Sequence, residues 1–308
     1  MSRRPRAVDP SALGRLALAA TAACFSGPIL RWADGPPLVL AAGRMLPAFL
    51  IALVPALVLW RRGGARALGV GRAVAMPMLL STVMLAVHFA AWTAGVYLTS
   101  VASAVVLVNA HPLVVLGAEA VVWKERVARR RWVGAIVALA GIAGLSGADA
   151  FALGGRFILG DALAFLGAVT YAVYVLASAR VRQRVPTGVQ VTVLYGGCLA
   201  LLAAAARVAG EAWPAPAAAP RLWLAFVLMA LVPTMLGHTM VQSILDRVRP
   251  GIISIALLAE PVGASLLAWA FLGQRPALFD VVGGALALAG IAIALWPEGE
   301  PAAPALAT

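Results

Sequence analysis

The stretch GAIVALAGIA, residues 134–143, recurs almost unchanged as GGALALAGIA, residues 283–292. The two stretches lie 149 residues apart in a chain of 308 residues, and the same offset relates Pro112 to Pro261. Each proline lies inside a long apolar run. A repeat of half the chain length in an apolar sequence predicts two fused copies of one membrane unit. Such duplication typically builds a transporter with its binding site between the halves.

The composition is that of a membrane protein. Hydrophobic residues make up 63% of the chain and charged residues only 12%, about half the charge of a typical soluble domain. Apolar runs of about 18 or more residues predict membrane-spanning helices. The sequence therefore predicts an all-α membrane protein with ten transmembrane helices, at residues 12–31, 37–60, 73–98, 101–123, 132–148, 157–179, 188–208, 221–245, 250–272 and 277–296.

The net charge of +12 reflects membrane topology and does not predict a nucleic-acid partner. With the N-terminus in the cytoplasm, 18 of the 24 Lys and Arg residues fall in cytoplasmic segments and five in outer segments. This bias predicts that both termini are cytoplasmic, because cytoplasmic loops of membrane proteins carry an excess of positive charge. We expect a multi-pass protein of a bacterial-type inner membrane, in contact with lipid.

The ten predicted spans divide evenly between the two halves. We expect a first five-helix repeat at 1–150, a second at 155–296 and a short cytoplasmic tail at 297–308. Because five is odd, the second copy must cross the membrane in the opposite direction to the first. This arrangement is an inverted repeat around a central cavity.

The loop charges agree with an inversion. The loop between spans four and five carries Lys124, Arg126 and Arg129–Arg131, whereas the counterpart loop between spans nine and ten carries only Arg275 as a basic residue. The two loops are therefore expected on opposite sides of the membrane.

Small and sulfur-containing residues within the spans have structural interpretations. Glycines of the repeated stretch, such as Gly134 and Gly283, are expected to let neighbouring helices approach closely. Cys24 and Cys198 both lie within predicted spans and are expected to be buried thiols, not a disulfide.

The two related prolines each follow a titratable residue. His111 precedes Pro112 in span four, and Glu260 precedes Pro261 in span nine. Proline cannot donate a helical hydrogen bond, so Pro261 is expected to leave the carbonyl of Leu257 without its usual partner. We interpret both prolines as helix kinks in cavity walls, because exposed backbone at membrane depth is tolerated next to a cavity. Alternatively, they bend the helices only for packing, and a hydroxyl satisfies Glu260.

Two pairs of polar residues recur at helical spacing. His88 and Trp92 are four residues apart in span three, and His238 and Gln242 are four apart in its counterpart, span eight. Ionisable groups within a span are costly and therefore mark functional sites. All four side chains are candidates for substrate binding, although Trp92 could equally face lipid.

Four further residues complete the candidate site. Tyr171 and Tyr174 share one face of span six, and such aromatic groups with a polar atom suit an amphipathic solute. Arg44 in span two could bind a carboxylate with its planar guanidinium, or could brace a neighbouring helix. Asn109 in span four could contact substrate or bond between helices.

Several residue groups together resemble the EamA family of the drug/metabolite transporter superfamily. They are Arg44 within AGRML (42–46), the run from SVASA (100–104) to His111-Pro112-Leu113, Glu125, Gly134 and Gly141, and Glu260-Pro261-Val262. Gln274 departs from the family, which often has glutamate there. The resemblance covers residues 12–296 and implies a ten-helix permease with a central cavity and no cofactor. Such permeases often export amino acids or other metabolites, and some resemble exporters of aromatic amino acids.

The favoured function is secondary transport by alternating access, with export of a small amphipathic metabolite, plausibly an amino acid. Protons could drive it through Glu260 or a histidine, or the solute could move down its own gradient. A channel or non-transporting subunit is the main alternative. A third hypothesis, an intramembrane serine protease, is supported only by the weak GxSG match at Gly144–Gly147. The sequence contains no metal-binding or nucleotide-binding motif.

Overall fold

The computed structural model describes residues 10–99, 101–145, 155–273 and 276–296, and the regular structure in these ranges is helical. The first half contains α1 (Pro10–Ala23), α2 (Ser26–Ala33), α3 (Pro37–Gly43), α4 (Met45–Ala67), α5 (Arg72–Leu98), α6 (Val101–Val108), α7 (His111–Val121) and α8 (Arg129–Leu145). The second half contains α9 (Gly155–Val181), α10 (Thr187–Val208), α11 (Pro220–Met229), the π-helix η2 (Ala230–His238), α12 (Thr239–Ile244), α13 (Pro250–Ala256), α14 (Ala259–Leu272) and α15 (Leu278–Leu295).

Within the described ranges, nine helical segments are long and apolar enough to cross a membrane. Eight of them coincide with a predicted span to within two residues at each end, and Pro37–Ala67 ends seven residues beyond the predicted span 37–60. The remaining predicted span, 132–148, corresponds to α8, whose described part is a 17-residue helix that begins with three arginines. The prediction of an all-helical membrane protein is confirmed, and α8 is the helix that does not meet the criterion of length.

Four spans are each broken into two helices, and a proline follows every break within the first three residues of the next helix. Breaks separate α1 from α2, α3 from α4, α6 from α7 and α13 from α14. The prolines are Pro28, Pro47, Pro112 and Pro261. Proline is tolerated in the first turn of a helix, where its missing N–H is not needed. The predicted kinks at Pro112 and Pro261 therefore take the form of complete interruptions.

The carbonyl oxygen of Leu257 lacks its usual partner, as predicted, because Pro261 has no N–H. It instead accepts a hydrogen bond from the backbone N–H of Glu260, three residues on, at 3.0 Å. The backbone therefore forms a hydrogen bond between residues three apart, instead of four, just before α14 begins. Such bonds are common at helix ends.

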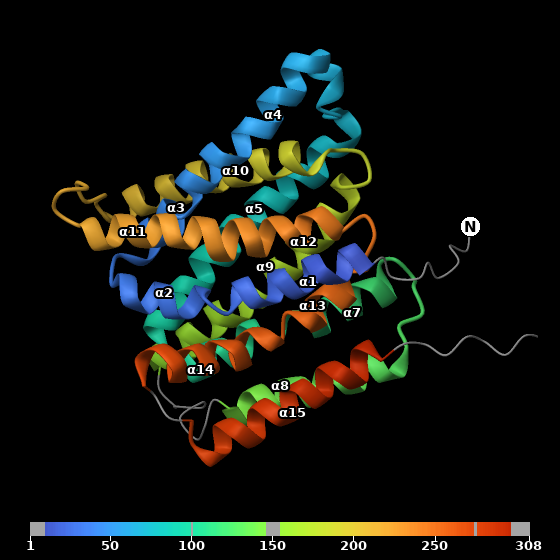
Figure 1. Ribbon diagram of the computed structural model, residues 1–308, viewed down its shortest axis with the longest axis vertical. Coiled ribbons are helices and arrows are strands. Elements are labelled where there is room, and N and C mark those ends of the chain that lie inside the picture. Colours follow the sequence, from blue (N-terminus) through green and yellow to red (C-terminus); the bar gives the residue numbers. More distant parts are fainter. Residues whose placement is uncertain (1–9, 100, 146–154, 274–275, 297–308) are drawn as a thin grey trace, which may run out of the picture.

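The repeated glycine stretches pack against each other. A Cβ added to Gly134 would lie 2.5 Å from the carbonyl oxygen of Gly290, and one added to Gly283 would lie 2.6 Å from that of Gly141. The helices α8 and α15 that carry them are therefore antiparallel and in backbone contact, and Figure 1 shows them side by side. The predicted role of the glycines in close packing is confirmed. The predicted buried thiols are also confirmed, since Cys24 and Cys198 are both free and buried.

Loops rich in basic residues meet at one end of the bundle. Arg249 forms an ion pair with Glu125 at 3.0 Å, and Arg182 forms one with Asp246 at 3.4 Å. These contacts bring together the loop after α7, the loop after α9 and the loop before α13. The beginning of α1 and the end of α15 lie on this same side in Figure 1.

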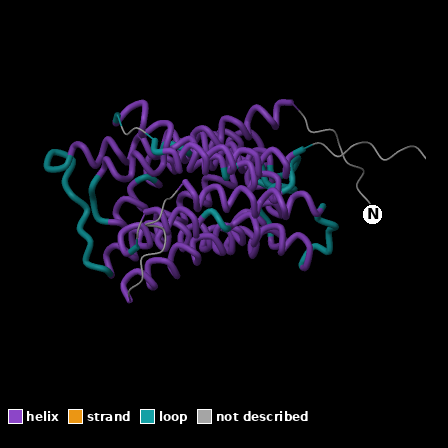
Figure 2. The backbone as a smooth tube through the Cα atoms, turned by 90° about the horizontal axis from the view of Figure 1, so that it is seen from below, coloured by secondary structure: helices purple, strands orange, loops and turns teal. Residues whose placement is uncertain are grey.

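The opposite end is held by carboxylates that bind backbone and hydroxyl groups. Glu211 accepts hydrogen bonds from the first backbone N–H groups of α3 at 2.9 and 3.0 Å, where the helix dipole favours a negative charge. Asp161 of α9 accepts from the hydroxyls of Thr99 and Ser103, each at 2.6 Å. The interior between the two ends contains the broken spans. Figure 2 shows the helices of the bundle from below, packed in layers.

Candidate functional site

A cavity of about 130 Å³ lies where the broken spans meet. Its wall combines side chains from both halves of the chain, including α1, α2, α5, α6 and α7 of the first half and α9, η2, α12 and α14 of the second. Eight of the ten predicted binding residues and one of the two predicted kink prolines line it: Arg44, His88, Trp92, Asn109, His111, Tyr171, His238, Glu260 and Pro261.

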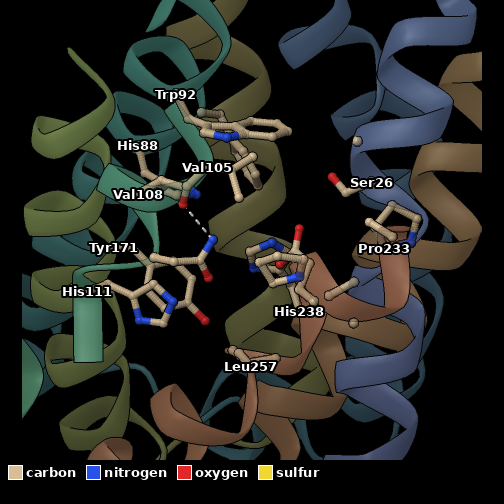
Figure 3. A pocket seen from close by; sticks show the side chains of 18 of the residues that line it. Ser26, His88, Trp92, Val105, Val108, His111, Tyr171, Pro233, His238 and Leu257 are labelled. Carbon is tan, nitrogen blue, oxygen red and sulfur yellow. Dashed lines mark hydrogen bonds between the residues drawn. The ribbon is translucent and has the colours of Figure 1, made fainter. Parts of the chain in front are cut away.

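Tyr171 is the centre of an aromatic and imidazole cluster in the wall. Its ring centroid lies 4.5 Å from that of His111, 5.1 Å from that of His88 and 6.3 Å from that of His238. All three histidines of the chain are thus gathered around one tyrosine. Figure 3 shows Tyr171 and His111 together, with His238 facing them and Trp92 nearby. Such a surface has apolar faces and polar edges, which suits an amphipathic solute.

Two of these histidines have defined surroundings. His88 Nδ1 lies 2.8 Å from the carbonyl oxygen of Gly167, so this nitrogen carries the proton and Nε2 is left as an acceptor in the neutral ring. His111 is 6% exposed, and its Nδ1 has no hydrogen-bond partner within the described ranges. An unpaired buried nitrogen is costly unless a ligand or water binds it.

Glu260 is half-buried in the first turn of α14. Among the residues that the structure describes, none forms a hydrogen bond or an ion pair with the carboxylate of Glu260. The first turn of a helix favours a negative charge through unpaired N–H groups. A carboxylate without a side-chain partner in a cavity wall is available to bind a proton or a substrate cation.

Arg44 also lines the cavity, and two of its five N–H donors are already engaged. Its Nε and Nη2 both donate to the hydroxyl of Thr234, at 3.1 and 2.9 Å. The guanidinium carbon lies 4.4 Å from the centre of the Phe89 ring, a distance typical of a cation–π contact. Of the two interpretations made from the sequence, these contacts favour the bracing of a neighbouring helix.

Tyr174 and Gln242 lie outside the cavity wall. Gln242 donates to the Tyr174 hydroxyl and accepts from Gln190 at 2.8 Å, and all three side chains are fully buried. Tyr174 follows the cavity residue Tyr171 by three residues, and Gln242 follows the cavity residue His238 by four. That spacing places both side chains about 5–6 Å further along their helix axes, beneath the cavity floor. Pro112 is likewise buried outside the wall.

Asn109 lies at the break between α6 and α7. Its side-chain Nδ2 donates to the carbonyl of Val105 at 2.8 Å. The amide therefore completes the end of its own helix, while its residue lines the cavity. This contact differs from the bond between helices that the sequence allowed.

Residues that the sequence analysis missed include Phe89, Ser26 and Pro233, all in the wall. The sequence does contain a signal for this position, because Pro233 and its neighbour Thr234 interrupt the apolar run of span eight. Gln274 and Ser146 lie outside the described residues. No group of three or more His, Cys, Asp or Glu side chains that could hold a metal ion occurs in the described part of the chain.

Comparisons with known proteins place this geometry in a wider context. The model of the EamA-like transporter family matches residues 12–147 and 158–296. No curated protein matches the sequence significantly. A crystal structure of another protein superposes with a TM-score of 0.77 at 22% sequence identity, covering 92% of this chain and 96% of its own. At that identity the likeness shows a shared fold.

Proposed function

Since the chain belongs to the EamA-like transporter family, a family of the drug/metabolite transporter superfamily, we propose that it is a secondary transporter. In this proposal it exports a small amphipathic metabolite, an amino acid, across a bacterial-type inner membrane. The observation that carries the proposal is the cavity between the two halves. Its wall contains a carboxylate without a side-chain partner among the described residues and an aromatic–imidazole cluster. Binding sites of transporters lie in this position, at the interface between repeats.

The helix contacts support the proposal of two inverted five-helix repeats. A two-fold axis in the membrane plane requires that wherever two spans meet, their counterparts in the other half also meet, and a span near the axis meets its own counterpart. Spans five and ten pack as α8 with α15, spans two and seven as α4 with α10, and spans four and nine as α7 with α13. Spans three and six pack as α5 with α9, and their counterparts, spans eight and one, pack as η2 and α12 with α1.

Alternating access follows from these repeats. The two halves would move about the cavity, which would open to one side of the membrane at a time. The broken spans provide places where the backbone can bend. We propose that the basic end, held by the Arg249–Glu125 and Arg182–Asp246 ion pairs, faces the cytoplasm and separates when the cavity opens inward.

Within the cavity, Glu260 is proposed to exchange a proton or to bind the amino group of the substrate. The apolar part of the substrate would contact the rings of Tyr171, Trp92 and the three histidines. The cavity volume of about 130 Å³ is below the range typical of drug-sized ligands, which favours a small solute. We thus propose both the outward direction of transport and its coupling to protons.

His111→Ala is expected to weaken apparent substrate affinity about tenfold with a smaller effect on maximal rate. The substitution removes a ring that packs on Tyr171 and a nitrogen that has no protein partner among the described residues. A tenfold change in affinity corresponds to about 1.4 kcal/mol. The measurement is the half-saturating concentration in vesicles. Thr192→Ala, which removes a hydroxyl bonded to backbone outside the cavity, serves as control. Unaltered affinity in His111→Ala would remove this residue from the site.

A counterflow screen in proteoliposomes tests the proposed function. Vesicles loaded with unlabelled amino acids, polyamines, nucleosides or cationic dyes are diluted into the same labelled compound, with and without a proton gradient. Transient accumulation of one class, absent from protein-free vesicles, is the expected result. If no compound accumulates but flux rises linearly with concentration, the channel alternative is supported instead.

A further inference from the structure

The π-helix η2 begins three residues before a proline within span eight. Pro233 has no N–H, so the carbonyl oxygen of Met229, four residues earlier, has no α-helical donor. The hydroxyl of Thr234 donates to that oxygen at 2.8 Å. Five residues further along the chain, the backbone N–H of Thr239 in turn donates to the Thr234 carbonyl. A hydroxyl and a five-residue spacing thus replace the usual hydrogen bonds of this turn.

The Thr234 hydroxyl uses its entire hydrogen-bonding capacity. A hydroxyl has one donor and two acceptor positions. It donates to Met229 and accepts from both Nε and Nη2 of Arg44. Thr234 is fully buried and Arg44 is 2% exposed, so water cannot replace either partner. The hydroxyl therefore joins the break in span two, where Arg44 lies, to the π-helical turn of span eight.

The same arginine reaches His238 by a second route. Its guanidinium lies over the Phe89 ring at 4.4 Å, and the Phe89 ring meets the His238 ring edge-on at 5.3 Å. His238 is the last residue of η2. Figure 3 shows Pro233 and His238 in the same wall of the cavity. Thr234 thus contacts Arg44 from the middle of η2, and Phe89 contacts its last residue, which carries the imidazole.

We propose that Thr234 is a positioning residue: its hydroxyl, held by Arg44, keeps the turn after Pro233 π-helical and thereby directs His238 into the cavity. A π-turn accommodates one residue more than an α-turn. If the turn became α-helical, the residues after it would rotate by about 100°. His238 would then leave the wall that faces Tyr171. The proposal deepens the proposed function, because it treats the cavity as the substrate site.

The test uses the three histidines as reporters. The chain contains three histidines, and all three line the cavity. Protein labelled with ¹³C at histidine Cε1 and held in nanodiscs gives three ring signals, assigned by single His→Gln variants. Thr234→Val keeps the shape of the side chain and removes its hydroxyl. We expect it to shift or broaden the His238 signal, while Thr234→Ser leaves all three signals at their wild-type positions.

A second variant tests the same turn without removing a partner from the buried Arg44. Pro233→Ala supplies the missing N–H and therefore folds with one more hydrogen bond available. It is expected to move the His238 signal in the same direction as Thr234→Val. If Thr234→Val does not fold, the His238 signal of Pro233→Ala decides whether this turn positions His238.

An unmoved His238 signal in a folded Thr234→Val protein overturns the positioning role. So does an unmoved signal in Pro233→Ala where the valine variant does not fold, or a Thr234→Ser protein that behaves like Thr234→Val. This readout needs no substrate. If the wild-type protein transports nothing while the variants shift the His238 signal, the proposed function fails and the role of Thr234 stands. If the wild type transports and the variants leave the signal unmoved, the role of Thr234 alone fails.

Discussion

Glu260→Gln is expected to abolish proton-driven transport while exchange of substrate across the membrane continues near the wild-type rate. Glutamine keeps the shape and the hydrogen-bonding oxygen of the side chain but cannot release a proton. Coupling therefore fails although the cavity can still bind and reorient. The measurement compares accumulation driven by an imposed pH gradient with equilibrium exchange at several pH values. We expect accumulation to fall by more than tenfold and the exchange rate to become independent of pH.

The matched control for this experiment is Glu125→Gln. Glu125 is also a glutamate of the same chain, but it pairs with Arg249 at the basic end and is partly exposed. An exposed ion pair contributes about 0–1 kcal/mol and this one lies outside the cavity, so this variant should keep the dependence of accumulation on the pH gradient, even where opening of the basic end changes the transport rate. An unchanged pH dependence in Glu260→Gln would exclude Glu260 as the coupling group and leave a histidine of the cavity as the candidate.

Gly283→Ala is expected to destabilise the protein, whereas Gly284→Ala is not. A Cβ at Gly283 would lie 2.3 Å from the backbone nitrogen of Leu145 and 2.6 Å from the carbonyl oxygen of Gly141. Backbone atoms cannot move aside as a flexible side chain can, so α8 and α15 must separate. Overpacking of this kind costs about 1–3 kcal/mol. The measurement is the midpoint of thermal unfolding in detergent, followed by tryptophan fluorescence.

The control lies one residue away on the same helix. A Cβ at Gly284 would meet side-chain carbons of Leu145 and Val262 at 3.6 Å, an ordinary van der Waals distance. Alanine also favours a helix over glycine by about 1 kcal/mol, so Gly284→Ala should keep or slightly raise the midpoint. Equal midpoints for the two variants would contradict close backbone contact between the repeated stretches.

The layout of helices could be predicted from the sequence because membrane spans are set by length and apolarity, which are local properties. The repeated glycines, for example, predicted close packing from composition alone. Their partner could not be predicted in the same way. That Gly134 meets Gly290, and Gly141 meets Gly283, depends on how distant spans are arranged in three dimensions.

The breaks in the spans were only partly predicted. Pro112 and Pro261 attracted attention because the repeat relates them, but Pro28 and Pro47 follow equivalent breaks and have no related proline in the other half. A search for every proline inside an apolar run would have found them. Pro55 lies inside α4 and does not end that helix, so proline alone does not determine where a span breaks.

Helical spacing predicted the direction of the candidate side chains better than their depth. His238 and Gln242 were assigned to one face, yet Gln242 lies below the cavity and bonds to Tyr174 and Gln190. Arg44 was assigned by its charge, but its hydrogen bonds depend on Thr234, which is 190 residues away in the sequence. Such partners follow from tertiary packing and leave no periodic signal.

The most direct test of transport through this cavity by alternating access is the initial rate of labelled substrate entry into proteoliposomes. The rate is measured against external concentration, with and without unlabelled substrate inside. A single site that opens to one side at a time predicts that the rate saturates and rises when the inside is loaded. A rate that increases linearly with concentration and ignores the internal substrate would contradict the account.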